Sequence, residues 1–259
     1  MTLSTSRTPW QGALNIVRFN WPIYAAAAVV VVVGAVVGVV AWWCGWPTVA
    51  LLLAAAAAVT TALSAGALWG SHLAYDRSDL YSWRWLDGWL DGAAQTIVHV
   101  HTGLDESSAA LRARFPAATV HVFDASDVDA QPEPSIARAR KLVPLDPATI
   151  AVGLGPLPVS AGSVDVLLLP MAAHEVRDDD VRARWLRALL PVLSSTGRVI
   201  VIEHLRDVPN TIAFHLGVLH FLSRRTWLRT FDAAGLQLVR EGRIASSLLA
   251  VFVLAPERP

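Results

Sequence analysis

The sequence has few of the features that mark disulfide-stabilised, zinc-binding or nucleic-acid-binding proteins. Cys44 is its only cysteine, which excludes an intrachain disulfide, and no pattern of Cys and His has zinc-ligand spacing. Lys141 is the only lysine, and 21 basic residues balance 21 acidic ones. A net charge of zero provides no electrostatic attraction to a polyanion, so nucleic acid is not expected as a partner.

Charge is also missing locally, in two consecutive apolar runs near the N-terminus. Residues 22–43 and 48–69 contain no charged side chain, and the residues between them, 44–47, form a predicted turn. Each run is long enough to cross a hydrocarbon core of ~30 Å as a helix. Tryptophans lie at the ends of both runs, as interfacial aromatics do: Trp21, Trp42, Trp43, Trp46 and Trp69. We expect a transmembrane two-helix hairpin over residues 21–70, with the lipid bilayer as a partner.

The distribution of arginine around the two runs predicts an orientation. Arg7 and Arg18 precede the first run, within an N-terminal segment of residues 1–20, and Arg77 and Arg84 follow the second. By the positive-inside rule, both termini and the C-terminal domain are expected in the cytoplasm, at the cell membrane. Gly34 and Gly38 have the spacing of helix dimerisation motifs, so the pattern permits a homodimer. Packing inside one hairpin explains the same spacing equally well.

Residues 71–95 form a linker crowded with Trp83, Trp85 and Trp89. Two interpretations remain open. The linker could be an interfacial helix lying on the bilayer. Alternatively, it could act as a lid, with Tyr75 and Tyr81 reaching over an adjacent pocket.

From residue 96 onward, strand and helix signals alternate, which predicts an α/β domain over residues 96–259 with a mostly parallel sheet covered on both faces. Residues 194–197 are predicted as a turn before a buried strand at 198–203. Two consecutive strand-like runs, 236–243 and 248–254, predict a terminal antiparallel hairpin. The unit at 96–124 is a strand, a turn at Gly103, a helix and a second strand ending on Asp124. In nucleoside-binding sheets, an acid in this position bonds the ribose hydroxyls.

Four stretches carry a resemblance to a known family. They are the unit at 96–124, LPVSAGSVDVLLL at 157–169, LLPVLSSTGRVIVIEH at 189–204 and TWLRTFDAAGLQLV at 226–239. In this order and spacing, they resemble the class I S-adenosylmethionine-dependent methyltransferases over about residues 96–255. The resemblance implies a Rossmann-like, seven-stranded, mostly parallel sheet with a terminal antiparallel hairpin. It also implies S-adenosyl-L-methionine as cofactor and methyl transfer as the reaction.

The resemblance further implies cofactor-binding positions. Asp124, followed by Ala125, takes the place of the ribose acid. The first loop of the family is rich in glycine, and this chain keeps one of those glycines. Gly153 and Leu154 fall where the family has an acid near the adenine, and Met171 follows the fourth strand. The cofactor residues of the first loop are then His101, Thr102, Gly103 and Asp105.

Polar side chains follow two neighbouring strands, where ligands bind in open α/β sheets. His174 and Glu175 follow the strand at 164–169, and Glu203 and His204 end the strand at 198–203. Histidine suits proton transfer because its unperturbed pKa lies near ~6.5. We therefore predict catalytic roles for His174, Glu175 and His204, with His174 as base or substrate-orienting residue. Candidate substrate or lid residues are Tyr75, Tyr81, His215 and His220.

These observations favour a membrane-anchored methyltransferase that acts on a small apolar or membrane-dissolved acceptor. Two alternatives from other classes remain. One is a scaffold or binding protein that keeps the fold without its chemistry. The other is a membrane protein that binds a metal through its His and Glu side chains. The segment 205–222 is apolar enough either to cap a pocket or to touch the bilayer.

Overall fold

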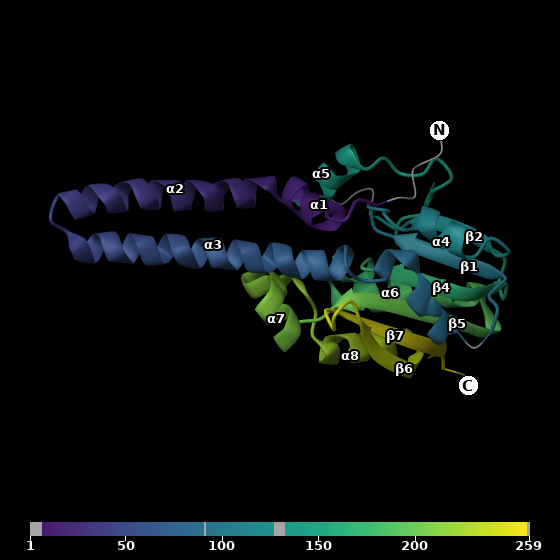
Figure 1. The fold of residues 1–259 in the computed structure, drawn as a ribbon. Helices are drawn as coiled ribbons and strands as arrows, with labels where there is room; N and C mark the ends of the chain where they lie inside the picture. The colour runs from purple at the N-terminus through teal and green to yellow at the C-terminus, as the bar shows by residue number, and fades with distance from the viewer. Residues whose placement is uncertain (1–6, 91, 127–132, 258–259) are drawn as a thin grey trace.

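A computed structural model describes residues 7–90, 92–126 and 133–257. Two long antiparallel helices project from an α/β domain (Figure 1). They are α2 (Trp21–Trp43) and α3 (Pro47–Tyr75), preceded by the short α1 (Gln11–Phe19). A proline lies in the first turn of both long helices, where its missing N–H costs no intrahelical hydrogen bond.

Both long helices are apolar on their exposed faces. In α2 only Gly38 and Ala41 are buried, and each of the two helices is long and apolar enough to cross a membrane. A Cβ added at Gly34 or Gly38 would lie within van der Waals contact of α3 atoms, at 3.7 Å from the Leu53 carbonyl and 3.6 Å from the Ala50 carbonyl. The small-residue pair is therefore used for packing within this hairpin.

The sheet has seven strands in the order β3-β2-β1-β4-β5-β7-β6. In this order, each pair of neighbouring strands in the row β3-β2-β1-β4-β5 is parallel. Strand β7 runs antiparallel to both of its neighbours, β5 and β6. This confirms the predicted seven-stranded, mostly parallel sheet with its terminal hairpin. The strands are β1 (Thr96–His101), β2 (Thr119–Asp124), β3 (Ile150–Ala151), β4 (Val164–Pro170), β5 (Leu193–His204), β6 (Leu236–Ile244) and β7 (Leu249–Pro256).

One strand boundary differs from the sequence prediction. The turn expected at 194–197 is part of β5, because Leu193 already pairs with Val164 before the register shifts at the next paired residues. Beyond that irregularity β4 and β5 stay in register as far as Pro170 and Ile202. The polar residues that follow these two strands are thereby brought to the same edge.

Five further α-helices lie in the described part of the α/β domain. Side-chain caps start three of them, with Asp178, Asp207 and Ser223 each accepting a backbone N–H of the first turn. The helices are α4 (Ser108–Arg114), α5 (Pro134–Leu142), α6 (Asp179–Leu189), α7 (Val208–Phe214) and α8 (Arg224–Ala234). Short 3₁₀ helices are η1 (Leu80–Ser82), η2 (Arg84–Gly88), η3 (Ala173–Glu175), η4 (Leu190–Val192) and η5 (His215–His220).

The linker after α3 packs onto the sheet. Leu80, Trp83 and Leu86 join a core cluster with sheet residues such as Ile97. Trp83 is 1% exposed, and its indole N–H donates to the carbonyl of Ser107 at 3.1 Å. This tryptophan is therefore a core residue, and it does not lie on the bilayer as one of the two interpretations of the linker would require. The short helices η1 and η2 hold this stretch in place of one interfacial helix.

Candidate active site

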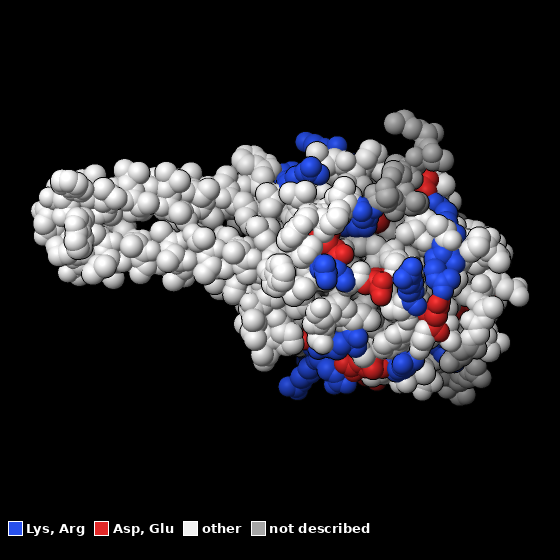
Figure 2. Space-filling model, viewed as in Figure 1, with Lys and Arg blue, Asp and Glu red and all other residues white. Residues whose placement is uncertain are grey.

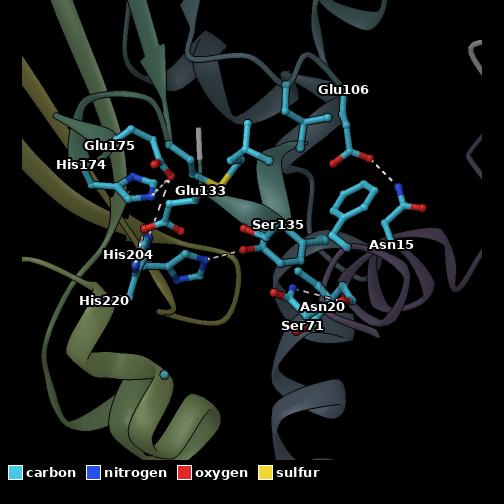
Figure 3. Close-up of a pocket in the computed structure, with 18 of the residues that line it drawn as sticks. Asn15, Asn20, Ser71, Glu106, Glu133, Ser135, His174, Glu175, His204 and His220 are labelled. Atoms are coloured by element: carbon cyan, nitrogen blue, oxygen red, sulfur yellow. Dashed lines mark hydrogen bonds and ion pairs between the residues drawn. The ribbon is translucent and has the colours of Figure 1, made fainter. Parts of the chain in front are cut away.

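A cavity of about 510 Å³ lies between the base of the hairpin and the carboxyl edge of the sheet. Its walls come from α1, the ends of α2 and α3 nearest the α/β domain, the loop after β1, the end of β4, and η5. Figure 3 shows His174, Glu175 and His204 on one side of it and Glu106, Asn15 and Ser71 on the other. The cavity therefore lies where the apolar hairpin meets the polar strand ends.

His174, in η3 after the end of β4, lies between two carboxylates. Its Nδ1 is 2.7 Å from Glu203 Oε2, and its Nε2 is 3.2 Å from Glu175 Oε1. The backbone N–H of His174 also donates to Glu203 Oε1, at 3.2 Å. Glu203 is the last residue but one of β5 and is 1% exposed. The parallel pairing of β4 with β5 thus fixes both the imidazole and the buried acid that orients it.

The two carboxylates decide the charge of this cluster. Burial by itself lowers the pKa of His174, but the Glu203 and Glu175 carboxylates outweigh it and raise the pKa to about 10. Burial raises the pKa of Glu175, but its hydrogen bonds to His174 and His220 outweigh that and hold the pKa well below its usual range. At neutral pH the imidazole is therefore a cation held between two anions.

His204, the last residue of β5, is uncharged, unlike His174. Burial lowers the pKa of His204 to about 4, so its ring is neutral at pH 7. Its Nδ1 lies 2.9 Å from the carbonyl of Leu248 and 3.0 Å from the amide oxygen of Asn210. Both partners are acceptors, so Nδ1 carries the proton. His204 Nε2 then accepts the hydroxyl proton of Tyr75 at 2.8 Å, which joins α3 to the sheet.

Replacing Tyr75 by phenylalanine is expected to lower the free energy of unfolding by about 1–3 kcal/mol, because His204 Nε2 would stay buried without its donor. Thermal unfolding in detergent measures this loss. Tyr24→Phe is the matched control, since it removes a hydroxyl from the α2 side of the same cavity. Equal melting temperatures for Tyr75→Phe and the unaltered protein would contradict the assignment.

Glu106 connects the N-terminal helices to the loop after β1. Its carboxylate accepts from Asn15 Nδ2 at 2.7 Å, from the Tyr81 hydroxyl at 3.2 Å and from Arg7 Nη1 at 3.3 Å. Glu106 and Asn15 were not among the site residues predicted from the sequence. Neither belongs to a local motif, because the contact joins residues 91 positions apart in the chain.

The turn after β1 holds the residues expected at a nucleoside site. Gly103 has a positive φ of 88°, which a glycine adopts without strain, and its N–H donates to His101 Nδ1 at 3.2 Å. The proton of this imidazole is then on Nε2, a buried atom without a hydrogen-bond partner in the described part of the chain. Asp124 lies opposite His101 in the parallel pairing of β1 with β2. An orphaned donor beside a buried carboxylate suits the polar atoms of a nucleoside ligand.

The side chain of Arg140, from α5, covers the turn at Gly103. Its guanidinium takes the space that a Cβ on Gly103 would occupy, and its Nε donates to the Gly103 carbonyl at 3.1 Å. Its Nη2 lies 3.7 Å from Asp124 Oδ2. The residues around Gly103 and Asp124 therefore fit the nucleoside part of the cofactor once the partly exposed Arg140 side chain turns away. Arg140 was not among the residues predicted from the sequence.

The cavity gathers many of the sequence-predicted residues but not all. Lining it are Tyr75, Tyr81, His101, Thr102, Met171, His174, Glu175, His204 and His220. Gly103, Asp105, Asp124, Ala125, Gly153, Leu154 and His215 are not among the lining residues. Asp105 instead accepts the backbone N–H groups of Ser107 and Ser108 at the start of α4. Leu154 packs against a core cluster, and His215 lies beside Gly66 of α3.

Three of the cavity residues also satisfy the geometry of a metal site. One potential ligand atom each from His174, Glu175 and His220 lie within 4.8 Å of one another. Glu203 would hold the second ring nitrogen of His174, as carboxylates do behind metal-bound histidines. However, the guanidinium of Arg177 lies against the ring of His220, 2.7 Å from Nε2, and its charge opposes a cation there.

Comparison with known proteins identifies the fold. No protein-family model and no curated protein sequence matches the chain. Among solved structures, the mitomycin 7-O-methyltransferase MmcR superimposes with a TM-score of 0.51 at 18% identity, over 97% of this chain and 74% of that one. The pyocyanin biosynthetic protein PhzM gives a TM-score of 0.50 at 19% identity, over 80% of this chain. This chain spans 57% of the length of PhzM. The chain therefore has the class I methyltransferase fold.

Proposed function

We propose that the protein is a membrane-anchored S-adenosylmethionine-dependent methyltransferase that acts on a small apolar or membrane-dissolved acceptor. The observation that carries this proposal is the cluster of His174, Glu203 and Glu175. It opens onto a cavity at the carboxyl edge of a class I methyltransferase fold. MmcR, which shares the fold, is an O-methyltransferase.

The cofactor would be held at the edge formed by β1 and β2. Asp124 would accept the ribose hydroxyls, Gly103 would allow close approach of the backbone, and His101 Nε2–H would donate to the ligand. Arg140 would have to release Asp124 first. When bound, S-adenosylmethionine supplies a methyl group on a sulfonium, which is open to in-line attack by a nucleophile. The protein's part is to place that nucleophile and to remove its proton.

His174 would place the acceptor and take its proton. An acceptor hydroxyl near Nε2 would replace the contact with Glu175 at 3.2 Å. Glu203 would keep Nδ1 protonated, so Nε2 becomes the basic atom once its own proton has gone to solvent. A base with a pKa of about 10 matches the acidity of a phenol, whose ordinary pKa is also about 10.

The cavity walls favour an apolar acceptor. Ile16, Phe19 and Ile23 line one side, and Phe214 and Phe221 line another. The same cavity touches α2 and α3 at the end nearest the domain, so an acceptor dissolved in the bilayer would have a short route to His174. Arg18 and Arg77, beside this end of the hairpin, support a cytoplasmic domain.

Transfer of a radiolabelled methyl group to a membrane lipid extract tests the proposal. The labelled product should form only with the protein present, and its rate should rise with pH. The sign follows from His174, whose raised pKa keeps it protonated and unable to accept a proton until the pH approaches about 10. A rate that is flat or falls between pH 7 and pH 9.5 would contradict a catalytic base at His174.

One observation favours a second candidate, a membrane scaffold that keeps the fold without the chemistry. Arg140 covers Gly103 and pairs with Asp124, the two residues that a nucleoside would need. In a scaffold this contact would be permanent. Binding of the cofactor product, S-adenosylhomocysteine, separates the two candidates, because a scaffold would not bind it.

A further inference from the structure

A second apolar surface lies beside the hairpin, on α7 and η5. Four side chains of this segment are strongly exposed: Val208 at 71%, Ile212 at 69%, Leu216 at 79% and Leu219 at 63%. Val208 and Ile212 are four residues apart on α7, and Leu216 and Leu219 are three residues apart on η5, so each pair lies on one side of its own helix. Asn210 and Val218 are buried on the opposite side. We call these four exposed residues the α7–η5 apolar face.

The α7–η5 apolar face carries no charge of its own. Residues 208–223 contain no Asp, Glu, Lys or Arg. The charged side chains visible in Figure 2 gather on the α/β domain and at the upper base of the hairpin, whereas the rest of the hairpin and the surface below it, where α7 lies, are white in this view. A cluster of large aliphatic side chains this exposed is unusual on a water-facing surface and marks an interaction site.

The contact with α3 determines the position of this face along the length of the hairpin. A Cβ added at Gly70 would lie 2.8 Å from the Ala213 Cβ, and one added at Gly66 would lie 2.8 Å from His215 Nε2. These two glycines therefore let α7 and η5 approach α3 closely. About 20 helical residues cross the hydrocarbon core, so a span that begins at Pro47 leaves it near Gly66. Trp69, half exposed between the two contact points, is an aromatic of the kind that marks the interface.

From this placement we propose that the α7–η5 apolar face inserts into the interfacial region of the bilayer and forms a second membrane contact beside the hairpin. Figure 1 shows α7 alongside α3, on the hairpin side of the sheet. Insertion of about 5–10 Å, the depth usual for interfacial helices, would bury its aliphatic side chains in the headgroup and acyl boundary. The inference depends on the proposed membrane anchoring but not on methyl transfer.

The insertion would also place the cavity at the bilayer surface. Phe214, Gly217 and Phe221, on the inner side of the same segment, line the cavity opposite Ile23 and Tyr24 of α2. With α7–η5 in the interface, the side of the cavity between η5 and α2 would face the lipid. A membrane-dissolved acceptor would then enter from the bilayer without passing through water.

Site-directed fluorescence in lipid vesicles tests the inference with the full chain. In a Cys44→Ser background, single cysteines are introduced as Ile212→Cys or Leu216→Cys and labelled with a polarity-sensitive dye. Val239→Cys, on the far strand β6, is the matched exposed control, and Val36→Cys, within α2, is the membrane control. Quenching is measured with a lipid that carries a doxyl group near its headgroup and, separately, with aqueous iodide.

The expected result is that dyes at positions 212 and 216 lose most of their fluorescence to the doxyl lipid and little to iodide, while the dye at 239 shows the reverse. If the two α7–η5 dyes are quenched by iodide instead, the inference is overturned. Protection from both quenchers also overturns it, because a protein partner or a second copy would then cover this face. If the dye at position 36 also fails to respond to the doxyl lipid, the proposed membrane anchoring fails as well.

Discussion

Replacing His174 by glutamine is expected to lower the rate of methyl transfer by about 10²- to 10⁴-fold, the usual contribution of general acid–base catalysis. Glutamine can still reach Glu203 with a hydrogen bond, but it cannot accept a proton at any pH. The affinity for S-adenosylmethionine should stay unchanged, because His174 lies in η3, after β4, and not beside Asp124. The loss should therefore appear in kcat, measured with saturating cofactor.

The control for this substitution is His121→Gln. His121 lies on β2, where it stacks on Phe123, and it is not among the residues that line the cavity. Its replacement should leave kcat within a factor of about two, as an ordinary substitution away from the site does. A His174→Gln protein that keeps the full rate, at any pH, would show that the reaction does not use this imidazole.

The second large effect is expected on stability, from Glu203→Gln. This change removes one partner of a buried ion pair in which the Nδ1–Oε2 distance is 2.7 Å. Breaking such a pair costs about 3 kcal/mol, because the remaining charge stays buried without its counterion. The cost depends on pH in a defined direction. The stabilisation is fully present below the unfolded pKa of about 6.5 and is lost as the pH rises through the folded pKa of about 10.

Unfolding of both proteins in detergent at pH 6 and pH 10 measures this difference, which should be large at pH 6 and small at pH 10. The pKa of His174 should also fall without Glu203, so any methyl transfer should begin to rise at a lower pH. Glu241→Gln, which removes an ion pair with Arg224 at the surface, should cost less than about 1 kcal/mol and serves as the control. An equal effect of Glu203→Gln at both pH values would contradict the assigned charge of His174.

The elements of the fold could be predicted because their signals are local. The buried runs of β4 and β5 are strongly apolar, and parallel strands bring their carboxyl ends to one edge. His174, Glu175 and His204 could therefore be predicted to lie close together. The two uncharged helices follow from length and composition. The position of the linker was harder to predict from the sequence. A tryptophan such as Trp83 is typical both of a bilayer interface and of a protein core.

The remaining parts of the site depend on contacts that no local pattern encodes. Glu106 meets Asn15 and Tyr81 only because α1 and the linker fold back over the loop after β1. Arg140 reaches Asp124 because α5 also lies against α1, where Arg138 donates to the carbonyl of Phe19. The placement of a long side chain across two elements is a tertiary effect, so the sequence predicted the ribose acid but not the cation beside it.

Binding of S-adenosylhomocysteine to the detergent-purified full chain, measured by isothermal titration calorimetry, tests the central claim most directly. The account predicts saturable binding that is lost in Asp124→Ala and strengthened in Arg140→Ala, because the arginine competes with the ribose for the same carboxylate. Arg224→Ala, at an exposed surface pair, should bind like the unaltered protein. Absence of binding at millimolar ligand, in both the unaltered protein and Arg140→Ala, would contradict a methyltransferase and leave the scaffold interpretation.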